Sequence, residues 1–296
     1  MDNKEATQER VREFWHEKPC GSDISKHDPA ERIYYDEIEE ERYRYQYHIP
    51  QIMDWLQWKD RTVLEIGTGV GTDARQIIAR GGIYTGINVD SGSVEATRTA
   101  LDVFGLSGTV RQSSATNIFL EDNSVDIVYS FGVFHHIPDV KTAVAEIARV
   151  LKRGGELLVM LYKRNSINYQ IKIRVLRRLL LRALTLPGVI PIFGALGFPR
   201  DKLGRHAEIY RQYGRLEEQE WLNRNTDGPD NPYSQVYSKS EAETLLGVGF
   251  EIVRNEAYYF EPRHWGVVGR LLPARLIYYL GKRWGWHRVI HAVKPG

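Results

Sequence analysis

The chain has 296 residues, of which 42% are hydrophobic and 26% charged, and its formal net charge is +2. This balance is typical of a soluble globular protein with one large core rather than of a disordered or membrane-spanning chain. A net charge so near zero gives no indication of nucleic-acid binding, which needs a concentrated basic face. Because Cys20 is the only cysteine, an internal disulfide and a cysteine-based metal site are excluded. The first residues lack the apolar run of a signal peptide, so we expect a cytoplasmic protein.

The first 58 residues are predicted to form a helical lid, with helices over 4–18 and 36–58 that are separated by proline and glycine. Tyrosines are frequent here, and they either close over a bound ligand or pack on the core: Tyr34, Tyr35, Tyr43, Tyr45 and Tyr47. The two interpretations are equally supported by the sequence.

Residues 59–162 alternate between short apolar strands and helices. The strands are expected at 63–66, 82–89, 109–111, 125–130 and 156–162, with helices at 72–80, 92–104 and 139–151. This alternation predicts parallel strands joined by right-handed helical crossovers.

After residue 162 the alternation stops, and residues 163–237 are interpreted as a helical insertion over the active site. A helix at 238–246 and strands at 250–258 and 287–293 then complete the core, with a second insertion at 261–286. We therefore predict a doubly wound, mostly parallel, seven-stranded α/β sheet with a helical lid.

A glycine-rich turn follows the first strand, at Gly67, Gly69 and Gly71. Such a turn lets a ligand approach the backbone closely at a helix amino terminus. The dinucleotide fingerprint needs a third glycine at the position of Thr72, so a nicotinamide site is not indicated. An isolated match of this kind is often only a tight turn.

Three motifs in the right order resemble those of the class I S-adenosylmethionine-dependent methyltransferases, small-molecule type. They are VLEIGTGVG at 63–71, VDIVYSFGVFHHIP at 125–138 and RVLKRGGE at 149–156. The resemblance covers about residues 60–162 and implies a Rossmann-like fold with S-adenosylmethionine as cofactor. The residues that it implies around the cofactor are Glu65, Gly67, Thr68, Gly69, Gly71, Asn88, Asp90, Ser114, Ala115, Thr116, Ser130 and Phe131.

Two positions depart from the family pattern. The second strand ends at Asn88 rather than at an acidic residue, with Asp90 two positions later, and Ser114-Ala115-Thr116 lacks the acidic residue that many members place near adenine. An amide can pair with both ribose hydroxyls, although without the strength of a carboxylate. We expect Asn88 to be the ribose ligand and keep Asp90 as the alternative.

The acceptor should lie beyond the carboxyl ends of the strands, near His135, His136 and Tyr162. His135 is our first candidate for a base and His136 the second, although an adjacent histidine pair before a proline also suits a structural turn. We predict no metal site, because no carboxylate at ligand spacing accompanies the pair.

Residues 171–184 are predicted to form a basic amphipathic helix. Val175, Leu176, Leu179, Leu180 and Ala183 would share one face, with Arg174, Arg177, Arg178 and Arg182 opposite. We favour packing of the apolar face on the core or on a second subunit, and contact with a membrane surface is the alternative. The sequence is compatible with a monomer and with a homodimer.

The expected function is methyl transfer to an oxygen, nitrogen or carbon of a small organic acceptor, such as a natural product in biosynthesis. A lipid-like or isoprenoid acceptor is the enzymatic alternative, suggested by the apolar insertion. A cofactor-binding regulatory protein without chemistry is the alternative of another class. A nucleic-acid substrate is the weakest alternative, because the basic residues form only one helix face.

Overall fold

The computed structural model describes residues 3–17, 19–213, 216–265, 269 and 271–296. A seven-stranded sheet in the order β3-β2-β1-β4-β5-β7-β6 forms its centre. The strands are β1 (Thr62–Ile66), β2 (Ile83–Asn88), β3 (Thr109–Gln112), β4 (Val125–Ser130), β5 (Leu151–Tyr162), β6 (Glu251–Tyr258) and β7 (His287–Val293). β7 runs antiparallel to β5 and β6, on either side of it, and the other described strand pairs are parallel. The predicted fold class is confirmed, and β5 begins five residues earlier than expected.

Two hydrophobic cores lie on the two faces of the sheet, because side chains alternate along each strand. Val63 and Ile127 pack with one set of helices, whereas Leu64 and Val128 pack with the other. The first set is α3 (His48–Met53), α4 (Thr72–Ala79) and α5 (Ser91–Phe104), and the second is α6 (Val140–Val150) and α11 (Lys239–Leu246). Ser238 and Glu241 form a capping box that fixes the start of α11.

The amino-terminal region folds as α1 (Asn3–Glu17) and α2 (Arg32–Tyr45), followed by the short α3. The single helix expected over 36–58 is therefore wrong: Pro50 lies in the first turn of a new helix, where proline is tolerated, and the chain turns between residues 45 and 48. Helix α2 packs on α4 and α5. The lid region is thus anchored beside the glycine turn.

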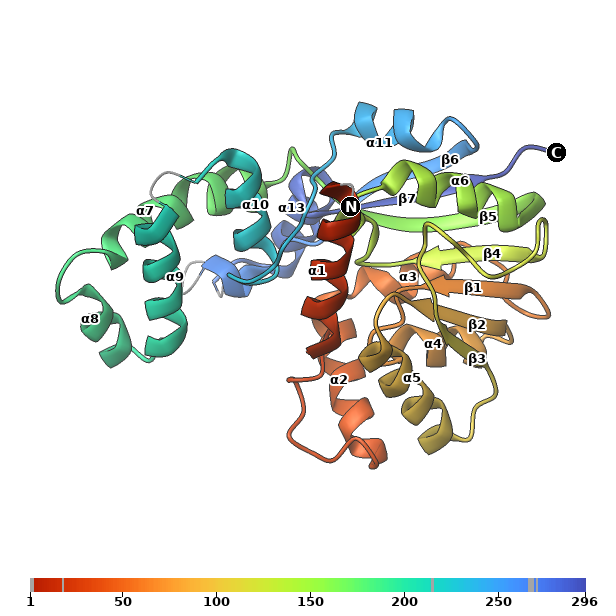
Figure 1. Ribbon diagram of the computed structural model, residues 1–296, viewed down its shortest axis with the longest axis horizontal. Coiled ribbons are helices and arrows are strands. Elements are labelled where there is room, and N and C mark those ends of the chain that lie inside the picture. The colour runs from red at the N-terminus through yellow and green to blue at the C-terminus, as the bar shows by residue number, and fades with distance from the viewer. Residues whose placement is uncertain (1–2, 18, 214–215, 266–268, 270) are drawn as a thin grey trace.

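The first insertion is helical, as expected. It comprises the π-helix η2 (Asn168–Leu176), α7 (Arg177–Leu184), α8 (Val189–Ala195), α9 (Arg200–Tyr213) and α10 (Glu218–Thr226). Figure 1 shows α7, α8 and α9 grouped in a lobe beside the sheet. The second insertion contains the 3-10 turn η3 (Pro262–Trp265) and α13 (Ala274–Trp284), which packs on β6.

The predicted packing of the apolar face of the helix at 171–184 on the core is wrong, whereas its packing on a second subunit stays a prediction. Its buried side chains are Ile173, Leu181 and Leu184, whereas Val175, Leu176, Leu179 and Leu180 are exposed. Arg177, expected on the solvent face, lies between Ile173 and Leu181 on the buried one and is only partly exposed. The prediction failed because it assigned the most apolar stripe to the core, while the fold turns a stripe containing an arginine inward.

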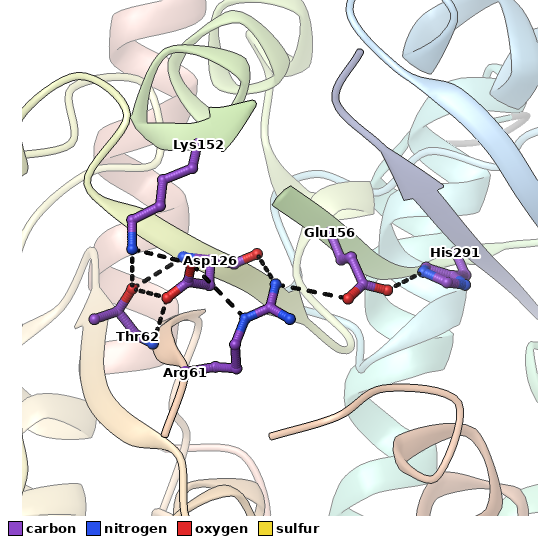
Figure 2. A network of polar contacts seen from close by, with 6 residues as sticks. All are labelled: Arg61, Thr62, Asp126, Lys152, Glu156 and His291. Atoms are coloured by element: carbon purple, nitrogen blue, oxygen red, sulfur yellow. Dashed lines mark hydrogen bonds and ion pairs between the residues drawn. The ribbon is translucent and has the colours of Figure 1, made fainter. Parts of the chain in front are cut away.

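A polar network at the amino edge of the sheet joins four strands (Figure 2). Asp126 accepts hydrogen bonds from the backbone N–H of Thr62 (2.9 Å), the Thr62 hydroxyl (2.7 Å) and Lys152 Nζ (2.9 Å). Burial opposes ionisation of Asp126, but the bonds from Thr62 and Lys152 outweigh it and lower its pKa to about 2. Glu156 pairs with His291 at 2.8 Å and lies 3.7 Å from Arg61. These contacts fix the edge of the sheet opposite to the one at which the glycine turn lies.

Candidate active site

A cavity of about 650 Å³ opens at the carboxyl edge of the sheet, where open α/β sheets bind ligands. Its walls come from the glycine turn, the ends of β2 and β4, the amino-terminal helices and both insertions. Of the five amino-terminal tyrosines, Tyr45 lines the cavity, whereas Tyr34 and Tyr35 are buried in a hydrophobic cluster behind α2. The cavity is large enough for a nucleoside cofactor together with a small acceptor.

The three glycines of the turn have different roles, although all have positive φ: 85° at Gly67, 55° at Gly69 and 80° at Gly71. A Cβ on Gly67 would come within 2.0 Å of Val133 Cγ2, and one on Gly71 within 3.0 Å of Ala100 on α5. A Cβ on Gly69 would meet only the Cys20 carbonyl oxygen, at 3.6 Å. Gly67 and Gly69 line the cavity, whereas Gly71 instead permits helix packing.

Glu65 is the penultimate residue of β1 and lines the cavity. Its side chain is 2% exposed and accepts a hydrogen bond from Tyr84, and it forms no ion pair among the described residues. Burial, reinforced by the charge of Asp73, raises the pKa of Glu65 well above its ordinary value. A cationic group bound here would stabilise the carboxylate, so the site fits the ammonium of a methionine-derived cofactor.

The two candidate ribose ligands both line the cavity but differ in what they already bind. Asp90 is fully buried, and its Oδ1 accepts a 2.6 Å hydrogen bond from the Ser93 N–H, which caps α5. Its Oδ2 is buried without a partner among the described residues. The Asn88 side chain forms no hydrogen bond within the described part of the chain. Both positions therefore offer a free polar group to a diol.

The other expected cofactor residues divide into two groups. Thr68, Ser114, Ala115 and Phe131 line the cavity. Thr116 and Ser130 do not: Ser130 Oγ donates to the Ile66 carbonyl oxygen (3.0 Å), and Thr116 Oγ1 pairs with Ser114 Oγ (2.7 Å). Their side chains hold the walls in place rather than face the cavity.

Of the two candidate bases, His136 lines the cavity and His135 does not. His135 is fully buried, stacked on Tyr162 with ring centroids 3.4 Å apart, and burial lowers its pKa well below the ordinary value. His136 Nδ1 donates to the Tyr233 carbonyl oxygen at 2.7 Å, so Nε2 is the free nitrogen. That atom lies 3.5 Å from Asp227 Oδ2.

Tyr162 also lines the cavity, and its hydroxyl donates to Asp227 Oδ1 at 2.9 Å. Burial, followed by the charge of Asp227, raises the pKa of Tyr162 well above its ordinary value. The phenol therefore stays protonated and acts as a donor that holds Asp227. His136, Asp227 and Tyr162 together form a polar cluster at the wall of the cavity.

Two groups at the site were missed in the sequence. Asp227 lies in the loop after α10, far along the chain from His136, and no local pattern singles it out. Asp73, in the first turn of α4, accepts hydrogen bonds from Arg42 Nε (3.1 Å), Tyr43 (2.9 Å) and Tyr129 (2.9 Å). The sequence signal for Asp73 was an acidic residue two positions after Gly71, the last glycine of the turn.

The sequence family described as "Methyltransferase domain" matches residues 64–159. Residues 64–159 therefore form a methyltransferase domain. The match covers the glycine turn and continues to the middle of β5. The cofactor of this class is S-adenosylmethionine, and Glu65, Gly69 and the free polar groups at Asn88 and Asp90 fit it.

Two curated relatives match about a third of the chain. Phosphoethanolamine N-methyltransferase 2 of Caenorhabditis elegans is 32% identical over 104 residues, which is 34% of this chain and 24% of the relative. Sterol 24-C-methyltransferase ERG6B of Gibberella zeae is 35% identical over 96 residues, or 31% of this chain and 25% of the relative. The matched part of the chain therefore spans about a quarter of the length of each relative.

Solved structures extend the likeness of fold beyond the domain. An S-adenosylmethionine-dependent methyltransferase from Methanosarcina mazei aligns with a TM-score of 0.53 and 21% identity, over 83% of this chain and 97% of that one. At this identity the likeness shows the fold alone.

The ribose contact can be tested with a variant that preserves the helix cap. We expect Asn88→Ala to weaken binding of S-adenosylmethionine by roughly 1–3 kcal/mol, about five- to a hundredfold, because ribose hydroxyls lose a partner. Asp90→Ser keeps a capping oxygen and should cost little affinity. Isothermal titration calorimetry measures both. A loss confined to Asp90→Ser would show that Asp90 is the ligand.

Proposed function

We propose that this protein transfers the methyl group of S-adenosylmethionine to a small organic acceptor bound in the cavity. The observation that supports this most is the continuity of the cavity, which runs from the glycine turn to the cluster of His136, Asp227 and Tyr162. When bound, the cofactor supplies an electrophilic methyl group, and the chain supplies positioning and exclusion of water.

We propose His136 rather than His135 as the base. Its Nε2 is free at the cavity wall, and Asp227 lies close enough to stabilise the charge that forms when a proton is taken up. His135 has no access to the cavity surface and stays neutral. The order of the two candidates is thus the reverse of that expected from sequence.

Methyl transfer to an acceptor is tested with a metabolite extract and S-adenosylmethionine that carries a labelled methyl group. We expect label to enter at least one small molecule with the wild-type protein and none with a variant that cannot bind the cofactor. Cofactor binding without any transfer, across polar and apolar extracts, would instead support the regulatory alternative.

We also propose that the first 58 residues and the two insertions act as a lid. Trp15, Arg177, Asp227 and Trp265 line the cavity from these three regions. Lids are ordered by ligand, so cofactor and acceptor together should slow amide hydrogen exchange in residues 163–237. Exchange that is unchanged there while turnover continues would contradict a lid at this segment.

A lipid-like acceptor is the second candidate, favoured by the exposed apolar surface of the lobe. Leu179, Ile192 and Leu196 are 61%, 61% and 69% exposed. Residues 163–200 contain eight lysines and arginines and no acidic residue, a composition typical of segments that lie on anionic membranes. Within the described residues no single helix is long and apolar enough to span a membrane. One pair of helices, Asn168–Leu184 and Val189–Ala195, has the length and composition when taken together, but the two are bent by 109°.

Vesicle sedimentation tests this candidate. Leu179→Ser with Ile192→Ser should reduce binding to vesicles of phosphatidylglycerol and phosphatidylcholine, because each change removes an exposed apolar side chain. Val248→Ser is the matched control, since Val248 is 88% exposed on the core beside α11. Equal binding by the double variant and the control would remove the support for a lipid-like acceptor, and a change of oligomeric state in the double variant would identify the lobe as a subunit contact.

A further inference from the structure

Lys172 and Arg177, two cations of the first insertion, line the cavity without an anionic partner among the described residues. Both side chains are only partly exposed. Arg177 donates to the Asn225 carbonyl oxygen and contacts His206 Nε2, each at 3.2 Å, and Lys172 Nζ has no hydrogen bond to a described residue. A cation withdrawn from water costs free energy unless an anion accompanies it.

The neighbours of this pair do not neutralise it. His206 is buried, and burial, followed by the charge of Arg177, lowers its pKa to about 4, so it is an uncharged acceptor. Burial and the charge of Arg177 likewise lower the pKa of Lys172 to about 8, with Glu261 only partly opposing them. Lys202, exposed at the same wall, adds a third positive charge.

The acidic groups on this side of the cavity are already engaged. Glu261 pairs with Arg263 (3.1 Å), and Glu41 lies 3.4 Å from Arg263 as well. Asp227 is held by Tyr162 and lies beside His136. Each of these carboxylates has a partner other than Lys172 or Arg177, so the cationic pair faces the cavity with its charge uncompensated.

The cavity that these cations line is also rich in aromatic side chains. They include Tyr45, Tyr259, Phe260, Trp265, Trp284 and Trp286. Flat apolar walls next to fixed positive charge suit a molecule with an aromatic or other apolar body and an anionic group.

We propose that Lys172 and Arg177 bind the anionic group, a carboxylate or a phosphate, of the methyl acceptor, whose apolar body lies against the aromatic walls. This rests on the proposed methyl transfer. It narrows the acceptor to organic acids or phosphate esters and assigns the selection of substrate to the first insertion. The methylated atom is then the part of the acceptor that reaches past the aromatic walls to the cofactor end of the cavity.

Calorimetry with matched probes tests the proposal in the presence of S-adenosylhomocysteine. The probes are 2-naphthoate, 2-naphthyl phosphate and the uncharged 2-naphthamide. Wild-type protein should bind at least one acid more tightly than the amide, and the two acids distinguish a carboxylate site from a phosphate site. Lys172→Met should reduce that preference by about tenfold or more, and Lys172→Arg should restore it, because a charge-assisted hydrogen bond is lost and regained.

Arg182→Met is the matched control, because Arg182 is exposed on α7 and does not line the cavity. It should keep the wild-type preference. The proposal is overturned if the wild-type protein binds the acids no better than the amide, or if Lys172→Met and Arg182→Met behave alike. If the wild-type protein prefers the acids but does not bind S-adenosylhomocysteine, the result counts against methyl transfer and still supports the anion site.

Discussion

Gly69→Val is expected to abolish binding of S-adenosylmethionine while the protein stays folded. The residue lines the cavity, and the space above it extends to the Cys20 carbonyl oxygen. A valine side chain would fill this space, which the cofactor must occupy if it lies over the turn. We expect affinity to fall by more than about a hundredfold, roughly 2.7 kcal/mol, as measured by calorimetry.

The control for this variant must separate backbone strain from loss of space. Gly69 has a φ of 55°, so valine there also carries a strain of about 1–2 kcal/mol. Gly105, at the end of α5, has a φ of 63° and no atom near its Cβ position. Gly105→Val should lower the melting temperature by a similar amount and leave cofactor affinity unchanged. Wild-type affinity in Gly69→Val would contradict a cofactor over this turn.

His136→Asn is expected to lower kcat by about 10²–10⁴-fold with an acceptor that must lose a proton, without changing cofactor affinity. The reason is the loss of Nε2, the nitrogen that faces the cavity beside Asp227. The measurement is methyl transfer to two acceptors, one that must lose a proton and one that need not. The loss of kcat should be confined to the first acceptor, which a purely structural role would not cause.

His135→Asn is the matched comparison, because His135 is the adjacent ring and lies away from the cavity. Its stacking on Tyr162 makes it a packing residue, so this change should lower the melting temperature and affect kcat with the two acceptors alike. If the selective loss with the proton-losing acceptor appears in His135→Asn and not in His136→Asn, the base has been assigned to the wrong histidine.

The sheet and the glycine turn could be predicted from the sequence because both depend on local patterns. Strands such as 63–66 and 125–130 are short apolar runs, and three glycines at alternate positions indicate a turn of positive φ. The three motifs then implied a Rossmann-like fold through the resemblance to a family. These are properties that a few neighbouring residues determine.

The chemistry of the acceptor side could not be predicted in the same way. The partners of His136 are Asp227 and Tyr233, which the fold brings back from about 90 residues away. The buried stripe of the helix at 171–184 contains Arg177, so its hydrophobic pattern indicated the wrong face. Charge turned toward a cavity is not visible in periodicity, because the contacts of Arg177 come from other elements, at Asn225 and His206.

Titration of the protein with S-adenosylmethionine and with S-adenosylhomocysteine, followed by calorimetry, tests the central claim most directly. We predict saturable heat with both ligands, lost in Gly69→Val and kept in Gly105→Val, because Glu65 and the glycine turn form the cofactor end of the cavity. No heat with either ligand at millimolar concentration, together with tight binding of a nicotinamide nucleotide, would contradict it.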